Sequence, residues 1–280
     1  MKNKLIITGI ILLLILSLSA CSNRKKRSER SATRQETPTE PNIKPVPPKV
    51  VPTEPVVVPN YDPKVPITPV RIARNLPASP KILFQKPNDR HSRQAFIDHY
   101  NITGEMKDLI VACDYDNSTV RNTAVLLGGF SPGEFNLGQV CEIFDYGYNN
   151  WKYVNDPVTG DYFSRASETL KNGLNGDCDD FAILLCSMLL SIGGEARINF
   201  AYDASSGHAF TEVNIGKTNQ SEVQRYLSAR YNNAQMWHRK DSQGNIWLNL
   251  DWQAQYPGGK YWDYNRGTSF NIIRNMCEHL

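Results

Sequence analysis

The stretch "NGDCDDFAILL", residues 175–185, decides the fold of this chain. A glycine and an acidic cluster stand directly before an apolar run that continues to Ile192, interrupted by only two serines. Because apolar residues occupy nearly every side of the predicted helix, we expect this helix to be buried rather than amphipathic. The Gly193-Gly194 pair predicts its end. We therefore expect one central helix surrounded by the rest of the domain.

Cys178 falls in the first turn of this helix. Asp177 is predicted to be the N-cap, and Asp180 stands where a capping-box acid reaches back to the cap amide, although glutamate is usual there. The helix end alone lowers a thiol pKa by less than one unit, because its effect is roughly 0.3 to 1 kcal/mol. An ionised thiol at neutral pH therefore needs an imidazolium partner. The alternative is an ordinary buried thiol beside solvated acids.

His208 is the best placed of the five histidines, because it follows a Ser-Ser-Gly turn and opens a predicted strand over residues 208–215. Such a base needs an acceptor that fixes its tautomer. In the strand predicted at residues 245–252, Asp251 lies on the polar face. If the two strands are neighbours, opposed Cβ atoms lie about 4.5 to 5.5 Å apart, and Asp251 can hold His208. Weaker substitutes for this acceptor are Asp203, Glu212 and Asp241.

The order of the remaining elements predicts an α+β fold. Helical spacing is found over residues 93–112, 137–154 and 164–171, ahead of the central helix. Strand alternation follows over residues 196–202, 208–215 and 245–252, and the sequence DSQGN before the last of these suits a hairpin turn. We place this globular domain at residues 82–280.

The first 81 residues do not belong to the predicted core. Residues 1–20 have two lysines followed by a short apolar segment, as in an export signal peptide. The segment ends in Leu-Ser-Ala-Cys21, which resembles the lipobox of bacterial lipoproteins, whose cysteine carries lipid. Residues 21–81 read as a disordered, proline-rich tether, with 13 of the 17 prolines between Pro38 and Pro80. The alternative is an uncleaved membrane anchor, which the basic residues 24–27 favour.

The other cysteines and the net charge restrict the function further. Besides Cys21 and Cys178, the four cysteines left allow three disulfide pairings, and Cys186 is most simply a core residue. The pairing of Cys113, Cys141 and Cys277 stays open. A net charge of +3, without a zinc-finger spacing or a phosphate loop, gives no sign of nucleic-acid binding. Metal binding by Cys178, His208 and nearby aspartates lacks ligand spacing, so we expect neither metal nor cofactor.

Three sequence blocks together resemble the transglutaminase-like superfamily: residues 175–200, residues 207–215 and residues 247–252. This resemblance implies a papain-related α+β core in which a buried catalytic helix packs on an antiparallel sheet. It also implies a Cys178, His208 and Asp251 triad. Some members use an upstream aromatic residue to stabilise the oxyanion, for which Trp151 and Tyr153 are the candidates. The insertion at residues 216–242 is longer than in the compact bacterial pattern, which is a reason to question the assignment of Asp251 as the triad acid.

The resemblance implies acyl transfer from an amide through a thioester. We expect a lipid-anchored enzyme of the cell envelope, facing the periplasm or the exterior, that hydrolyses peptide or isopeptide bonds of envelope protein or peptidoglycan rather than cross-linking them. The expected partners are a protein or peptide substrate and, through lipid on Cys21, a membrane. The alternative is a non-catalytic envelope-binding or structural lipoprotein on the same scaffold.

Overall fold

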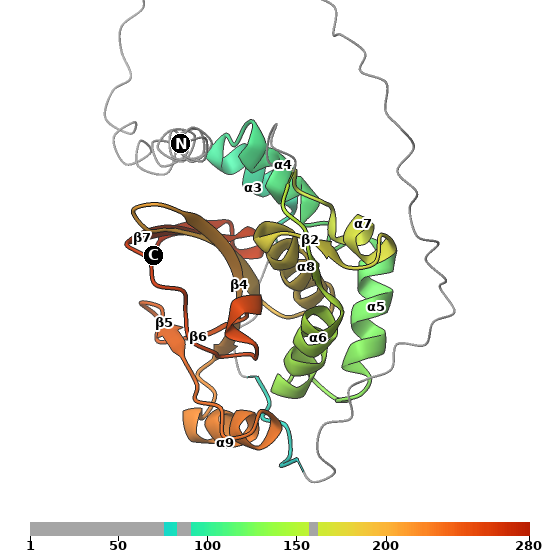
Figure 1. The fold of residues 1–280 in the computed structure, drawn as a ribbon, viewed down its shortest axis with the longest axis vertical. Helices are drawn as coiled ribbons and strands as arrows, with labels where there is room; N and C mark the ends of the chain where they lie inside the picture. The colour runs from blue at the N-terminus through green and yellow to red at the C-terminus, as the bar shows by residue number, and fades with distance from the viewer. Residues whose placement is uncertain (1–75, 83–90, 157–161) are drawn as a thin grey trace, which may run out of the picture.

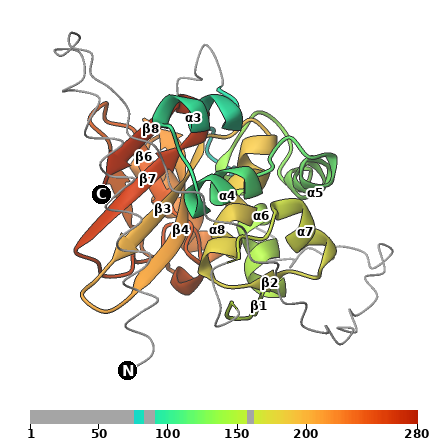
Figure 2. The ribbon, with the colours of Figure 1, turned by 90° about the horizontal axis from the view of Figure 1, so that it is seen from above.

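The computed structural model describes residues 76–82, 91–156 and 162–280 of the chain. Most helices come first along the chain and form one layer, and a sheet of later strands forms the other, with one helix inserted between two of those strands (Figures 1 and 2). The described helices are α3 (Arg93–Tyr100), α4 (Glu105–Ala112), α5 (Ser118–Gly128), α6 (Leu137–Asn150), α7 (Ala166–Lys171), α8 (Cys178–Ser191) and α9 (Gln220–Arg230). This is the predicted α+β arrangement.

Six strands form one antiparallel sheet in the order β5-β6-β4-β3-β7-β8. They are β3 (Ala196–Tyr202), β4 (Gly207–Gly216), β5 (His238–Lys240), β6 (Ile246–Asn249), β7 (Arg266–Asn271) and β8 (Met276–His279). The predicted neighbours β4 and β6 do pair, with Glu212 opposite Asn249. The predicted turn at residues 241–245 joins β5 to β6, and Asp241 accepts hydrogen bonds from backbone N–H groups inside it.

The central helix α8 is buried along nearly its whole length, as its sequence predicts. It contacts β3 and β4 on one side and α5, α6 and α7 on the other. Every residue from Asp179 to Leu190 is buried. A hydrogen bond from Thr211 Oγ1 to the carbonyl of Ala182, 2.7 Å long, joins the helix to β4. Apolar packing therefore holds the start of α8 against the sheet.

Two of the predicted helices differ from the structure. The helix expected at residues 93–112 is divided into α3 and α4, because Asn101 adopts a left-handed conformation with φ 52° and ends the first helix. The helix expected at residues 137–154 ends at Asn150, and β1 (Lys152–Tyr153) follows. Two backbone N–H groups, of Lys152 and Val154, donate to carbonyls of the segment that precedes α8, which draws the chain into a strand.

The insertion at residues 216–242 forms α9 and β5. Arg230 at the end of α9 donates from Nη2 to Asp145 of α6, at 2.7 Å, and from Nη1 to Glu142, at 3.0 Å. The hydroxyl of Tyr231 donates to the same aspartate at 2.8 Å. The insertion is thus fastened to α6 and leaves the pairing of β4 with β6 intact.

The N-terminal part of the described chain lies against the domain. Ser79 Oγ accepts a hydrogen bond from the N–H of Gly138, at 2.7 Å, and Lys81 forms a single bridge with Asn136. The folded part thus reaches at least to Leu76, a few residues before the predicted start at Ile82. Cys21 and the tether as far as residue 75 lie outside the described residues. Within the described ranges, no helix is both long and apolar enough to cross a bilayer.

Candidate active site

The start of α8 is built by its acidic residues, as the capping interpretation predicts. Asp177 is the N-cap and accepts a hydrogen bond from the N–H of Asp179 at 3.2 Å. Asp180 accepts from the N–H of Asp177, which completes the capping box, and from the N–H of Ser164 at 2.7 Å. Gly176 precedes them with φ 152°, and a Cβ there would lie 2.2 Å from a carboxylate oxygen of Asp180. Only glycine fits at this position.

The surroundings of the Cys178 thiol oppose its ionisation. Burial raises the pKa of Cys178, and so do the charges of Asp179 and Asp177, while a hydrogen bond from the N–H of Ala209 lowers it. The aspartates therefore do more than cap the helix, and they act against the thiolate that the sequence interpretation requires. Any ionisation of this thiol at neutral pH depends on a proton acceptor close to it.

His208 and Asp251 form a buried pair beside this thiol. Nε2 of His208 lies 2.7 Å from Oδ2 of Asp251, and the two side chains are only 4% and 2% exposed. The carboxylate is the acceptor in this contact, which places a proton on Nε2 and leaves Nδ1 as the free base. Asp251 also caps the short turn η1 (Trp252–Ala254), accepting from the N–H of Gln253 at 3.0 Å. Its carboxylate is therefore held by two contacts.

The Cys178 thiol, at the start of α8, contacts the start of β4 next to His208. The N–H that donates to the sulfur belongs to Ala209, the residue after His208, and the charge of Asp251 also acts on the thiol. The structure thus brings the three predicted residues Cys178, His208 and Asp251 to one place, from α8, β4 and the end of β6. The three weaker substitutes are otherwise engaged: Glu212 with arginines, and Asp203 and Asp241 within turns.

Trp151 and Tyr153 are positioned beside Cys178 by a small parallel ladder. β1 pairs with β2 (Asn175–Gly176), the strand that leads into α8. The Trp151 ring packs on Phe181 of α8, with centroids 5.1 Å apart. Its Nε1 atom is buried and has no hydrogen-bond partner among the described residues. Burial, followed by the charge of Cys178, raises the pKa of Tyr153 to about 12. Tyr153 therefore lies near enough to the thiol to feel its charge, while Trp151 packs on the same helix and has a free donor.

Two tryptophans that follow Asp251 also reach the site. Trp252 packs on Tyr153 at a tilt of 32° with ring centroids 5.2 Å apart, and Trp262 meets the His208 imidazole edge-on at 5.5 Å. In the sequence these side chains belong to an aromatic-rich tail whose simpler interpretation is core packing. Their spacing from Asp251 gives no sign of which ones turn toward the histidine.

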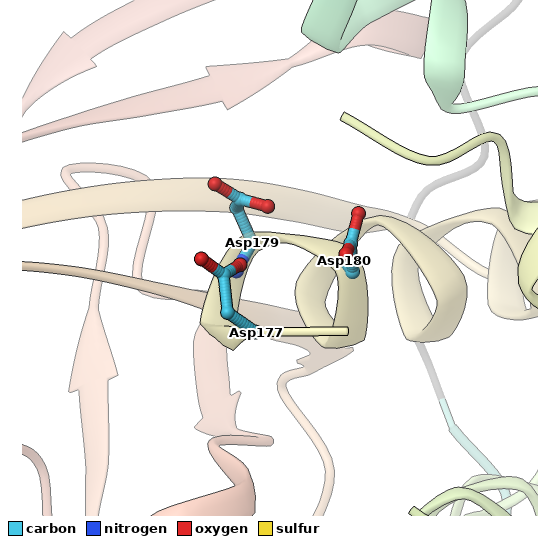
Figure 3. Close-up of side chains that lie close together, drawn as sticks. All are labelled: Asp177, Asp179 and Asp180. Atoms are coloured by element: carbon cyan, nitrogen blue, oxygen red, sulfur yellow. The ribbon is translucent and has the colours of Figure 1, made fainter. Parts of the chain in front are cut away.

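The three aspartates at the helix start are also the only group of the described residues whose ligand atoms could converge on a cation, within 4.8 Å of one another (Figure 3). Each of them already has a partner in the protein. Asp177 and Asp180 accept backbone N–H groups. Burial and the charge of Asp177 raise the pKa of Asp179 well above its usual range, and Asp179 hydrogen-bonds to Asp177. All three side chains are thus engaged by the protein itself.

The five described cysteines are all free thiols. Cys186 is buried within α8, as the sequence predicts. Cys113 accepts a hydrogen bond from Ser187 Oγ at 3.3 Å, and Cys141 lies in the core of α6. The N–H of Cys277 donates to the hydroxyl of Tyr100.

Comparisons with known proteins agree with this geometry. The family model of the transglutaminase-like superfamily matches residues 130–252, which run from the end of α5 to the residue after Asp251. The resemblance to that superfamily which the three sequence blocks suggest is thus confirmed over these residues. Their α+β fold is the papain-like core that the sequence predicted.

Solved structures with a similar arrangement include LapG of Legionella pneumophila in its calcium-bound form, 18% identical, with a TM-score of 0.35 over 64% of this chain and 84% of that one. A second is a protein of Cytophaga hutchinsonii proposed to be a cysteine protease, 16% identical, with a TM-score of 0.34 over 60% of this chain and 51% of that one. None of the curated proteins matches the sequence.

Proposed function

We propose that this protein is a cysteine enzyme that transfers the acyl group of a protein amide, and that Cys178, His208 and Asp251 are its nucleophile, base and orienting acid. The observation that carries the proposal is the buried 2.7 Å contact between His208 and Asp251. The residue after His208, Ala209, donates its N–H to the Cys178 sulfur, so the pair lies beside the thiol. A histidine fixed in one tautomer beside a thiol is the arrangement that nucleophilic catalysis requires.

The chemistry follows from these positions. As the sulfur of Cys178 attacks the substrate carbonyl carbon, its proton passes to Nδ1 of His208, and the new charge falls on the carbonyl oxygen. The N–H of Cys178, unpaired at the helix start, and the Nε1–H of Trp151 are the donors for that oxygen. His208 then gives the proton to the leaving amine as the C–N bond breaks, which leaves a thioester. Water resolves the thioester in hydrolysis, and an amine resolves it in cross-linking.

We favour hydrolysis of peptide or isopeptide bonds in cell-envelope protein, with peptidoglycan as another acceptable substrate. The test is to incubate the full-length chain with envelope extract and to identify released peptides and new isopeptides by mass spectrometry, against Cys178→Ala as control. Released peptides that depend on Cys178 support hydrolysis, and new isopeptide links support cross-linking. Identical spectra for the two proteins would contradict the enzymatic function.

The second candidate function is a non-catalytic envelope-binding module. Its support is the environment of the thiol, where burial and the charges of Asp179 and Asp177 raise the pKa of Cys178. In that case Cys178→Ala should bind envelope material as the unchanged protein does, and neither should alter it. A pull-down with both proteins, followed by analysis of the bound material for cleavage, separates the two functions.

The proposal includes anchoring of the enzyme to a membrane through lipid on Cys21, by way of the tether. Its support is the sequence before Cys21 and the proline content of residues 21–81. An extended chain of about fifty residues reaches on the order of 150 Å from the lipid surface. Cells that express the protein and are fed an alkyne-labelled palmitate should label it, and Cys21→Ser should abolish the label. A labelled Cys21→Ser protein would contradict this anchoring.

A further inference from the structure

The imidazole of His208 is enclosed between two aromatic rings. Phe210, two residues along β4, lies on one side with its ring centroid 6.2 Å away and nearly parallel. Trp262 meets the imidazole at 5.5 Å and 62°. Phe210 is fixed because it belongs to the same strand. Trp262 lies in a loop that has no regular secondary structure, so something else has to fix its position.

The segment that carries Trp262 is fastened on both sides. The hydroxyl of Tyr261 donates to Oε1 of Glu212 at 2.6 Å, and Nη1 of Arg239 donates to the hydroxyl of Tyr264. The guanidinium of Arg239 also lies over the Tyr261 ring, 4.9 Å from its centroid. Trp262 therefore stands between two tyrosines that are bound to one ion pair, since Nε of Arg239 donates to Glu212 at 2.8 Å.

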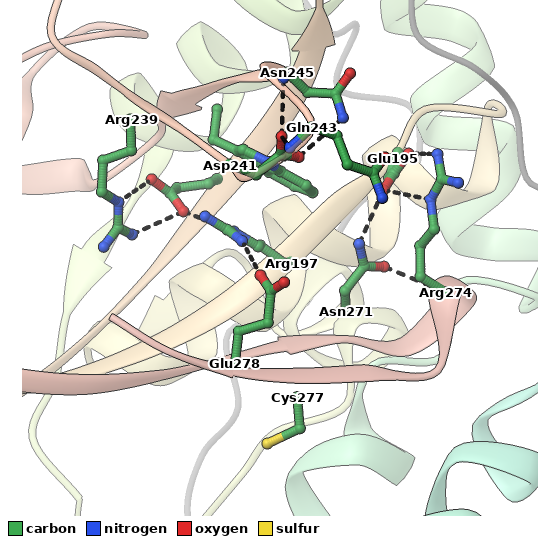
Figure 4. Close-up of polar contacts among 12 residues, drawn as sticks. Glu195, Arg197, Arg239, Asp241, Gln243, Asn245, Asn271, Arg274, Cys277 and Glu278 are labelled. Atoms are coloured by element: carbon green, nitrogen blue, oxygen red, sulfur yellow. Dashed lines mark hydrogen bonds and ion pairs between the residues drawn. The ribbon is translucent and has the colours of Figure 1, made fainter.

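Glu212 is the centre of this arrangement and is completely buried. Burial opposes its charge, but Arg197 and Arg239 outweigh burial and lower the pKa of Glu212 to about 2. Arg197 donates to it at 2.8 Å and also contacts Glu278, as Figure 4 shows. A buried ion pair is weak evidence for a role in stability, because the cost of desolvating both charges offsets their attraction. The loop of Trp262 is attached to this carboxylate through the hydroxyl of Tyr261.

Glu212 and His208 share a strand and a face. They are four residues apart on β4, and strand geometry turns residues 208, 210 and 212 to the same side of the sheet. The carboxylate therefore holds the loop directly over the strand that delivers the histidine. The contact between His208 and Asp251 on this strand is almost inaccessible to water, because the two side chains are only 4% and 2% exposed.

We propose that Trp262 is a positioning residue for His208, and that the buried carboxylate of Glu212, acting through Tyr261, holds the tryptophan against the imidazole and keeps the histidine–aspartate pair dry. This inference rests on the proposed function. Attraction between imidazolium and carboxylate weakens steeply when water enters. Loss of the indole should therefore make His208 a poorer proton acceptor for the thiol. The titratable groups that face the thiol and imidazole are Asp251, Asp177, Asp179 and Tyr153, and the variants below leave all four unchanged.

The test is the pH dependence of Cys178 alkylation by iodoacetamide in the full-length protein. Trp262→Ala should move the midpoint upward by about one pH unit, which is about a tenfold loss of rate on the acid side of the curve. Trp262→Phe, which keeps a ring edge at the imidazole, should restore most of the rate. Tyr261→Phe removes only the hydroxyl that binds Glu212 and should produce a smaller shift in the same direction.

Trp237→Ala is the matched control, because Trp237 is 43% exposed and makes no ring contact with the histidine. It should leave the midpoint unchanged. A purely structural role for Trp262 would lower the melting temperature without moving the midpoint, so thermal unfolding of each variant is measured alongside. Midpoints of Trp262→Ala and Tyr261→Phe equal to that of the unchanged protein would overturn the inference. If the unchanged protein itself shows no reaction that depends on His208, the proposed function fails, and this inference fails with it.

Discussion

At the scale of single residues, the charges around Cys178 work in opposite directions. Burial and the neighbouring aspartates raise the pKa of the thiol, and the hydrogen bond from the N–H of Ala209, which lowers this pKa, does not outweigh them. Without a proton acceptor this thiol therefore keeps its proton. On this account the orienting contact of Asp251 decides how well the histidine accepts that proton.

Asp251→Asn tests this role at constant size. The amide can still contact Nε2 but carries no charge to stabilise an imidazolium, so kcat should fall by about 10³ to 10⁴ with little change in KM. Steady-state kinetics on a substrate peptide identified in the envelope experiment would measure it. Asp203→Asn, in an exposed turn, is the control and should leave both constants unchanged. A fall of less than about threefold for Asp251→Asn would exclude Asp251 as the orienting acid.

Trp151→Phe tests the oxyanion donor. Phenylalanine keeps a ring that can pack on Phe181 and removes only the buried Nε1–H, which has no partner among the described residues. If that N–H binds the developing oxyanion, kcat should fall by about 10² to 10³. Trp237→Phe is the control. Kinetics of Trp151→Phe indistinguishable from those of the control would leave the Cys178 N–H as the principal donor.

At the scale of elements, α8 was predictable because its signals are local. The cap, the apolar run and the terminating glycines all lie within twenty residues, and the alternating patterns of β3, β4 and β6 are each contained in one short segment. β1 was not predictable, because its partner carbonyls belong to residues 174 and 176, more than twenty positions further along the chain. The strand β7 was missed because polar residues such as Thr268, Ser269 and Asn271 are buried in it, which breaks the apolar alternation.

The same comparison applies to the site. The identities of Cys178, His208 and Asp251 followed from a helix start, a strand start and a polar strand face, each readable in sequence. Trp262 did not, because its place depends on Tyr261 and Tyr264 meeting Glu212 and Arg239 across long intervals of the chain. The effect of Asp179 on the thiol could not be predicted either, because the burial of Asp179 is a property of the folded packing.

Asp177→Ala tests the cap of α8. It removes the acceptor for the N–H of Asp179, and we expect the free energy of unfolding to fall by about 1 kcal/mol. Asp177→Asn keeps an acceptor oxygen and should retain most of that stability. Urea denaturation of both variants measures the difference. Equal destabilisation by alanine and asparagine would show that the side chain does not act as a cap.

At the scale of the whole molecule, the insertion between His208 and Asp251 is accommodated at one end of the sheet. Figure 1 shows α9 at the lower edge of the molecule. Arg230 fixes it to Asp145 and Glu142 of α6. The long insertion therefore does not disturb β6, the strand that leads to Asp251, because the pairing of β4 with β6 is intact.

Arg230→Ala tests this attachment. It leaves the buried carboxylate of Asp145 without its ion partner, which typically costs about 3 to 5 kcal/mol of stability. Arg225→Ala on the same helix is the matched control, because Arg225 is exposed, and it should change stability by no more than about 0.5 kcal/mol. Denaturant unfolding measures both. Similar effects of the two variants would show that the ion pair does not hold the insertion in place.

The most direct test of the central claim, that His208 takes the proton of Cys178, is the rate of iodoacetamide alkylation of Cys178 at pH 6 to 7 in the unchanged protein and in His208→Ala. Mass spectrometry of the Cys178 peptide assigns the label to this thiol among the others. We expect rapid alkylation in the unchanged protein and a rate lower by about a hundredfold or more without the imidazole, because an isolated buried thiol is almost fully protonated at this pH. Alkylation only above pH 8, at equal rates in both proteins, would contradict the account.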